Sequence, residues 1–258
     1  MTTTTPAIGR TTRSSSFVTL IGGFAIIYLA LDRSATWTNS RFGEYGLLIC
    51  ALTIGAALLT EWLLFGQQPR QVLAALGFGR PRVSGLLAGL FTSMALLAYF
   101  PIFALASGQP LTLRAEWPAV AFGVLLQGGV AEELLWRGYL FRHLRATRGF
   151  WRAAAIAMIF MVAQHTLILW ELPLPIAIAA LVVALLSSFP LAHLFEVGGN
   201  TIYGPALLHA VIQGAPKVIV VPESTLLPAQ LGWMAASVVL PYLAFLVRRA
   251  APIDHGVS

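Results

Sequence analysis

Long apolar runs separated by short polar segments set the pattern of this 258-residue chain. A helix that crosses a bilayer needs about 20 consecutive, mostly apolar residues, and a shorter one is tolerated inside a bundle. The pattern therefore predicts an all-α fold, a polytopic transmembrane helix bundle of about eight spans. The predicted spans are residues 17–31, 45–65, 85–106, 118–141, 151–169, 174–195, 201–215 and 226–247.

Polar segments bound the apolar part of the chain at both ends. The Thr- and Ser-rich stretch 1–15 is predicted to be a disordered polar N-terminus, and residues 250–258 a short C-terminal tail. Residues 16–249 are predicted to form a single transmembrane helical domain with the catalytic motifs within 118–215. The first apolar run has no small-residue cleavage site, so we expect a retained span rather than a signal peptide.

Composition and charge agree with a place in the membrane. Hydrophobic residues make up 58% of the chain and charged residues 10%, whereas a soluble domain carries about a quarter charged residues. With a cytosolic N-terminus, eleven basic residues fall in inside segments and four (Arg33, Arg41, Arg114 and Lys217) in outside loops. This bias follows the positive-inside rule, predicts that both termini are cytosolic, and explains the net charge of +6 without nucleic acid as a partner. We expect an integral protein of a prokaryotic plasma membrane.

Ionisable side chains inside the spans are few, and a charged one costs about 2.5–3.5 kcal/mol to insert at mid-bilayer. Glu132, Glu133 and Arg137 all lie in the fourth span. Glu133 and Arg137 are four residues apart, so they share a helix face and are predicted to form a structural salt bridge. Glu132 is rotated by about 100° from Glu133 and is left to face something else. Glu61 lies near a span end, where we expect it to reach water.

Three polar residues in other spans could face Glu132. His165 lies in the fifth span, and His209 and Gln213 lie four residues apart in the seventh. A carboxylate, two imidazoles and an amide around a cytosol-facing cavity could hydrolyse a peptide bond, because the carboxylate can take a proton from water while the others orient the water or donate to the oxyanion. Each histidine alone is equally well explained by a helix-to-helix hydrogen bond. The combination therefore carries the hypothesis.

These residues form three short motifs. They are Glu132-Glu133-x-x-x-Arg137, Met161-x-x-x-His165 and His209-x-x-x-Gln213. The motifs resemble Glu-Glu-x-x-x-Arg, Phe-x-x-x-His and His-x-x-x-Asn of the CAAX protease and bacteriocin-processing (CPBP, or Abi) family of intramembrane endopeptidases, which includes the CAAX prenyl endopeptidase. The resemblance extends over about residues 85–215 and departs from the family where Met161 replaces Phe and Gln213 replaces Asn.

The resemblance implies an intramembrane endopeptidase of the glutamate type, which hydrolyses a peptide bond of a membrane-associated peptide or protein substrate. In that family, the residues that correspond to Glu132 and His165 activate water, and those that correspond to His209 and Gln213 form the oxyanion hole. The resemblance implies neither a cofactor nor a metal ion. It also makes prenylated proteins one candidate class of substrate. The expected partners are therefore the substrate and the lipid bilayer.

Two further functions would use the same residues. Glu132, His165 and His209 could hold zinc with an open position in a metal-dependent version of the same hydrolysis. The sequence has no His-Glu-x-x-His helix, which weighs against zinc. A non-catalytic immunity or scaffold protein, or a proton-coupled transporter, would also retain buried Glu and His. The sequence shows no inverted repeat of the kind many transporters carry.

Overall fold

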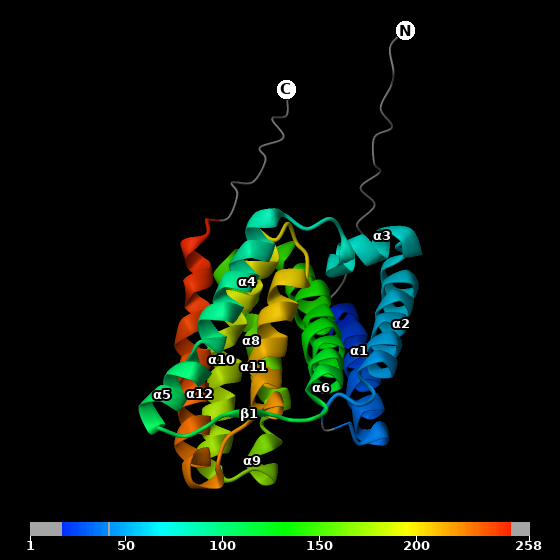
Figure 1. The fold of residues 1–258 in the computed structure, drawn as a ribbon. Coiled ribbons are helices and arrows are strands. Elements are labelled where there is room, and N and C mark those ends of the chain that lie inside the picture. The colour runs from blue at the N-terminus through cyan, green and yellow to red at the C-terminus, as the bar shows by residue number, and fades with distance from the viewer. Residues whose placement is uncertain (1–16, 41, 249–258) are drawn as a thin grey trace.

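We describe the protein in a computed structural model, which places residues 17–40 and 42–248. The described part is a bundle of helices with one short two-stranded sheet (Figure 1). The predicted disordered N-terminus 1–15 and the predicted tail 250–258 lie outside the described residues.

Six helical segments make up the first half of the described chain. They are α1 (Phe17–Thr38), α2 (Gly46–Phe65), α3 (Pro69–Leu73), η1 (Ala74–Phe78), α4 (Val83–Leu97) and α5 (Tyr99–Ser107). Gly66 ends α2 with a positive φ of 67°, a left-handed conformation that glycine adopts without strain. The chain can therefore turn into α3 directly after the apolar run ends.

The middle of the chain holds the helix on which the first motif lies. Its elements are β1 (Thr112–Leu113), α6 (Trp117–Val124), η2 (Leu125–Ala131), η3 (Leu134–Phe141), α7 (Arg142–Arg145), α8 (Phe150–His165) and α9 (Ile168–Glu171). From α6 to α7 the helix is continuous, and η2 and η3 are wound as π-helix on either side of Glu132 and Glu133. π-Helical turns are rare and are frequently found at functional sites.

The last part of the described chain forms four helices, one strand and a short 3-10 turn. Its elements are α10 (Leu174–Val197), α11 (Tyr203–Val218), β2 (Ile219–Val220), η4 (Glu223–Thr225), α12 (Leu226–Val239) and η5 (Leu240–Leu246). β2 pairs with β1 in antiparallel register, with Thr112 opposite Val220. We call the end of the bundle that carries these strands the β end, and the end that carries α7 the α7 end (Figure 1).

Seven helical stretches among the described residues are long and apolar enough to cross a membrane. They are Phe17–Thr38, Gly46–Phe65, Gln71–Ser107, Trp117–Arg145, Phe150–Glu171, Leu174–Val197 and Glu223–Leu246. The predicted span 201–215 is helical as α11, but its 16 residues are too few to count with the others. The prediction of a transmembrane helix bundle is confirmed, with seven long helices and one shorter helix in place of eight spans.

The direction of the chain alternates from one of these helices to the next. Helix α1 therefore starts, and η5 ends, at the α7 end of the bundle (Figure 1). The first and the last described helices therefore have their outer ends at the same end of the bundle. That the α7 end faces the cytosol remains a prediction.

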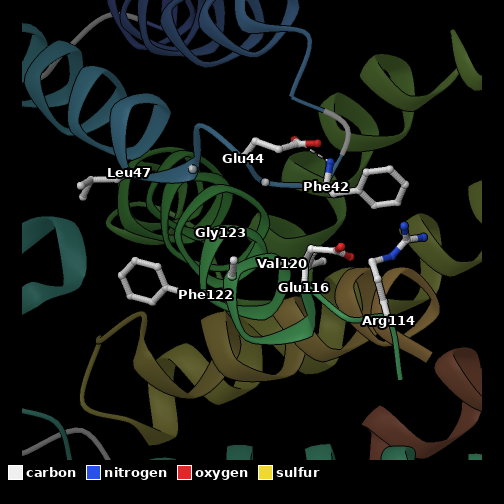
Figure 2. A pocket seen from close by; sticks show the side chains of 11 residues that line it. Phe42, Glu44, Leu47, Arg114, Glu116, Val120, Phe122 and Gly123 are labelled. Atoms are coloured by element: carbon white, nitrogen blue, oxygen red, sulfur yellow. Dashed lines mark hydrogen bonds between the residues drawn. The ribbon is translucent and has the colours of Figure 1, made fainter. Parts of the chain in front are cut away.

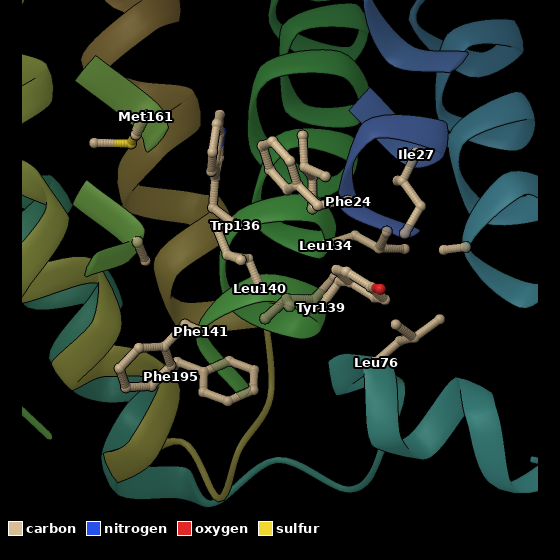
Figure 3. Close-up of a cluster of buried hydrophobic side chains, with 14 of the residues drawn as sticks. Phe24, Ile27, Leu76, Leu134, Trp136, Tyr139, Leu140, Phe141, Met161 and Phe195 are labelled. Carbon is tan, nitrogen blue, oxygen red and sulfur yellow. The ribbon is translucent and has the colours of Figure 1, made fainter. Parts of the chain in front are cut away.

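The core of the bundle surrounds η3. All eight residues of η3 are buried, and Figure 3 shows Trp136, Tyr139 and Leu140 among Phe24 and Ile27 of α1 and Leu76 of η1. The outer faces of the helices leave many large apolar side chains exposed, as a surface in contact with lipid would. The first motif therefore lies in the most enclosed part of the molecule.

Helix α11 lies between α4 and η2, at distances that only small residues allow. A Cβ atom on Gly89 of α4 would lie 2.8 Å from the Cα atom of Gly204, and one on Gly129 of η2 would lie 2.7 Å from the carbonyl oxygen of Ala206. Small residues let membrane helices approach closely in this way. The approach brings the side chains of α11 to Glu132 and Glu133.

Candidate active site

The two adjacent glutamates point to different partners. Glu133 is fully buried, and its Oε1 atom lies 2.6 Å from Arg137 Nη1 and 2.6 Å from His209 Nδ1. The sequence predicted the pairing with Arg137, but it assigned His209 to Glu132. Two donors on one oxygen hold Glu133 in place, and its Oε2 atom has no hydrogen-bond partner. Glu133 thus ties the helix of the first motif to α11.

Glu132 is the more accessible of the two carboxylates. Its side chain is 19% exposed, Gln213 Nε2 donates a hydrogen bond of 3.1 Å to its Oε1 atom, and His209 Nε2 lies 3.7 Å from its Oε2 atom. The carboxylate keeps room for a further donor, because Gln213 occupies only one of its oxygens. Such a group can accept a proton from a bound water.

The hydrogen bonds of His209 and Gln213 fix the tautomer of the histidine. Glu133 can only accept when ionised, so Nδ1 of His209 carries a proton. Gln213 Nε2 lies 2.9 Å from His209 Nε2, and as a donor it leaves that ring nitrogen as the acceptor. The two amide protons of Gln213 therefore go to His209 and to Glu132.

A glycine makes room for the longer amide at position 213. A Cβ atom on Gly128 would collide with Oε1 of Gln213, whereas the hydrogen atom of glycine leaves that space free. The replacement of the family's Asn by Gln is thus accommodated on the facing helix. A Cβ atom on the adjacent Gly129 would instead contact the backbone of α11. Gly128 thus leaves space for a side chain, and Gly129 lets the two helices approach.

His165 lies at the C-terminal end of α8 and is not hydrogen-bonded to Glu132 or His209 among the described residues. Its Nδ1 atom lies 2.8 Å from the carbonyl oxygen of Met161, one turn earlier, and a carbonyl can only accept. The free Nε2 atom of a neutral His165 is therefore an acceptor. The side chain of Met161 faces the first motif, since its sulfur lies 4.0 Å from Arg137 Nη2. The residue that departs from the family pattern thus contacts the first motif.

The metal alternative needs three ligands that converge. Within the ranges that the structure describes, no three His, Cys, Asp or Glu side chains gather into a group that could hold a metal ion. Glu132 and His209 are close, but His165 does not complete a set with them. The arrangement therefore gives no support to a zinc site made of these three residues.

Sequence reasoning missed a second ionic cluster, at the α7 end. Glu61 was expected to reach water, and this was wrong: its side chain is fully buried. Arg142 Nη2 forms an ion pair with Glu61 Oε1, and His143 Nε2 lies 2.8 Å from the same oxygen. The adjacent Arg142 and His143 in the basic segment were the sequence feature that could have indicated a partner for Glu61. Their packing over α2 could not be inferred from hydropathy.

A cavity of about 590 Å³ lies at the β end, away from Glu132. Figure 2 shows it between the start of α2 and the start of α6, with Glu44, Arg114 and Glu116 around it and Phe42 and Phe122 in its walls. It does not include the four predicted catalytic residues. The predicted single cavity that would join them stays a prediction.

The stretch of chain that carries these contacts is similar to a known protein family. Residues 114–215 match the family model described as type II CAAX prenyl endopeptidase Rce1-like. No curated protein matches the chain. The matched stretch runs from the end of β1 to the last turn of α11, so it contains the three motifs and the contacts between them.

Proposed function

Because residues 114–215 form a domain of the Rce1-like type II CAAX prenyl endopeptidase family, which implies intramembrane proteolysis, we propose that Glu132 activates the water that attacks the peptide bond. The substrate is a membrane-associated peptide or protein, with prenylated chains as the first class to test. Glu132, His165, His209 and Gln213 carry the reaction, and Glu133 and Arg137 hold the site together.

One observation carries this proposal: the two glutamates differ in access and in charge partners. Glu133 is fully buried, and the Arg137 cation and the N–H of His209 both favour its ionised form, so it is a poor acceptor for a further proton. Glu132 is partly exposed, and among the described residues the neutral amide of Gln213 is the one donor that it binds. A general base must reach its water and must be free to take up a proton, and Glu132 alone meets both conditions.

The proposed reaction begins with a water molecule bound beside Glu132. Water attacks the carbonyl carbon of the scissile bond while Glu132 takes one of its protons, with the Nε2 lone pair of His165 orienting the water. Negative charge develops on the carbonyl oxygen. Protonation of Glu132 weakens its hold on Gln213, so that the amide is free to donate to this oxyanion. His209 donates as well when it has taken up a proton from solvent at Nε2 before the attack, and it keeps that proton through the reaction. The carbon–nitrogen bond then breaks, and Glu132 returns its proton to the leaving amine.

The ionic contact of His209 supports its part in this sequence. Glu133 lies at Nδ1 of the ring, and a carboxylate there stabilises the imidazolium that would form as His209 gains a proton at Nε2. A neutral His209 accepts from Gln213 at rest, and a protonated one donates to the oxyanion. Glu133 is thus a positioning residue that acts through His209.

The test is cleavage by the full-length protein in lipid vesicles. A panel of fluorogenic peptides, prenylated on a cysteine or carrying a transmembrane segment, is offered to the wild-type protein and to Glu132→Gln. We expect the wild-type protein to cleave at least one class, and the variant to be slower by about 10²–10⁴-fold, the range for loss of a general base. Activity should survive treatment with a chelator.

Two results would overturn the proposal. Absence of cleavage across the whole panel would favour an immunity, scaffold or transport protein, and proton flux that depends on Glu132 would identify a transporter. Loss of cleavage on chelation and its return with zinc would establish the metal-dependent alternative. Circular dichroism and size exclusion of Glu132→Gln serve as the folding control.

A further inference from the structure

Lys217 extends the face of α11 that carries the candidate site. His209, Gln213 and Lys217 follow one another at intervals of four residues, so their side chains share one face of the helix. Each interval advances about 6 Å along the axis at 1.5 Å per residue. Lys217 therefore stands one turn closer to the β end than the amide that contacts Glu132.

The sequence placed Lys217 in a loop after the seventh span, whereas the structure places it in the last turn of α11. Helix α11 continues through Pro216 to Val218, although a proline removes one backbone donor from a helix. Proline leaves the carbonyl oxygen of Ile212 without its helical donor, and Trp233 Nε1 donates to that oxygen at 3.1 Å instead. The indole thus allows the helix to continue and keeps Lys217 on its surface.

Two hydrogen bonds from Arg114 hold the backbone around Lys217. Arg114 Nε donates to the carbonyl oxygen of Lys217 at 3.0 Å, and Arg114 N donates to that of Val218 at 2.9 Å. Among the described residues, no hydrogen bond or ion pair joins the ammonium group of Lys217. The charges that act on it from a distance are the carboxylates of Glu132 and Glu44. Glu44 lines the cavity at the β end.

Lys217 is a partly buried cation for which the described residues supply no ion-pair partner. The side chain is only partly exposed, and a cation withdrawn from water is costly unless it meets an anion. Among the described residues Glu132 attracts Lys217 only at longer range and forms no ion pair with it. The position is therefore suited to a negative group that arrives with a ligand.

We propose that Lys217 binds a carboxylate of the peptide substrate and so sets which bond is presented to Glu132. This inference rests on the proposed function, because the bound ligand is the chain that is cleaved. The carboxylate is either the C-terminus of the substrate or an acidic side chain near the scissile bond. Both sources offer the same chemistry to an ammonium group.

The spacing on α11 fixes how far the carboxylate stands from the cleaved bond. Lys217 lies about 6 Å from Gln213 and about 12 Å from His209 along the helix axis. An extended peptide advances about 3.3 Å per residue. The bound carboxylate therefore lies about two to four residues from the scissile carbonyl.

The experiment compares three peptides that differ only at one end. Each carries a farnesylated cysteine followed by three residues, and ends in a free carboxylate, in an amide, or in an amide with Asp as the last residue. Their kcat/KM values are measured with the wild-type protein, Lys217→Met, Lys217→Arg and Arg152→Gln. Arg152→Gln is the matched control, since it removes one exposed charge at the α7 end of α8.

We expect the wild-type protein to prefer the acid to the plain amide by about tenfold or more, as for a hydrogen bond between charged groups. Lys217→Met should remove this preference, and Lys217→Arg should keep most of it. Arg152→Gln should match the wild type. The Asp peptide distinguishes the two sources: cleavage as fast as the acid peptide means that a side-chain carboxylate suffices, and cleavage as slow as the plain amide means that the C-terminus is required.

If Lys217→Met prefers the acid peptide to the plain amide by the same factor as the wild-type protein, the proposal is overturned, even if Lys217→Met cleaves both peptides more slowly. Such a result would mean that Lys217 acts only on the charge of Glu132. If the wild-type protein cleaves none of the peptides, the proposed function fails, and anisotropy with the same labelled peptides tests Lys217 separately. Equal binding of acid and amide would then refute the role of Lys217.

Discussion

Glu133 and Glu61 are two buried glutamates with the same kinds of partner in two parts of the bundle. Glu133 Oε1 binds Arg137 and His209, and Glu61 Oε1 binds Arg142 and His143. In both cases the second carboxylate oxygen is buried without a hydrogen-bond partner. The two clusters thus offer the same chemical groups.

The difference lies in what stands next to each cluster. Beside Glu133 is a second carboxylate, that of Glu132, which is partly exposed and bound by Gln213. Beside Glu61 are the aromatic rings of Phe65 and Tyr139, with the ring of Phe65 centred 4.4 Å from that of His143. An ionic cluster by itself joins helices. A neighbouring accessible base is what the proposed hydrolysis would require, and only the Glu133 cluster has one among the described residues.

The largest effects should come from removing either buried carboxylate. Glu133→Gln leaves the buried Arg137 without its counter-ion and should lower the free energy of unfolding by about 3–5 kcal/mol. Glu61→Gln should cost less, because its partner Arg142 is 22% exposed. Unfolding titrations in mixed micelles measure this loss. Only Glu133→Gln should also reduce cleavage per folded molecule, by about 10²-fold, because His209 loses the group that stabilises its protonated form.

Rates must be divided by the folded fraction for this comparison. Equal losses of cleavage per folded molecule in Glu133→Gln and Glu61→Gln would contradict the separation of a reactive cluster from a structural one. Unchanged stability in both variants would contradict the assignment of either cluster as a tie between helices.

The adjacent glycines of η2 should separate packing from chemistry. Gly129→Ala meets the backbone of α11, so it should cost about 1–3 kcal/mol of stability. Gly128→Ala meets the end of the flexible Gln213 side chain, so it should leave stability nearly unchanged and lower kcat about tenfold by displacing that amide. Thermal unfolding and kcat of the two variants test this. The reverse assignment of effects would refute the fit of Gln213 against Gly128.

The smallest effect is expected from shortening the amide itself. Gln213→Asn should lose the hydrogen bond to Glu132, worth about 0.5–1.5 kcal/mol, and lower kcat/KM about two- to twelvefold. Gln127→Asn is a matched control, because Gln127 bonds to Ser40 outside the cluster. A faster Gln213→Asn enzyme would show that the resting contact with Glu132 restrains the amide.

Much of the fold could be predicted from the sequence because the apolar runs are long and clearly bounded. The exceptions have physical causes. Helix α11 is shorter than a normal span, since it lies against α4 and η2 inside the bundle. It continues through Pro216 because the indole of Trp233, far along the chain, satisfies the freed carbonyl. A local pattern cannot include such a donor.

The candidate site was predictable only in part, for a related reason. The pairing of Glu133 with Arg137 follows from a spacing of four residues on one helix. The contact of His209 with Glu133 depends on how α11 packs against a π-wound helix, which no spacing specifies. The burial of Glu61 depends in the same way on Arg142 and His143 folding over α2.

The central claim is that Glu132 takes a proton from water and forms no bond to the substrate. Its most direct test is cleavage by the wild-type protein over many turnovers in water labelled with oxygen-18, followed by mass spectrometry of the released peptide and of the enzyme fragment that contains residue 132. The account predicts one labelled oxygen in the new carboxylate of the product and none in Glu132. Label in the side chain of Glu132 would contradict it, because that oxygen exchanges only through a covalent intermediate.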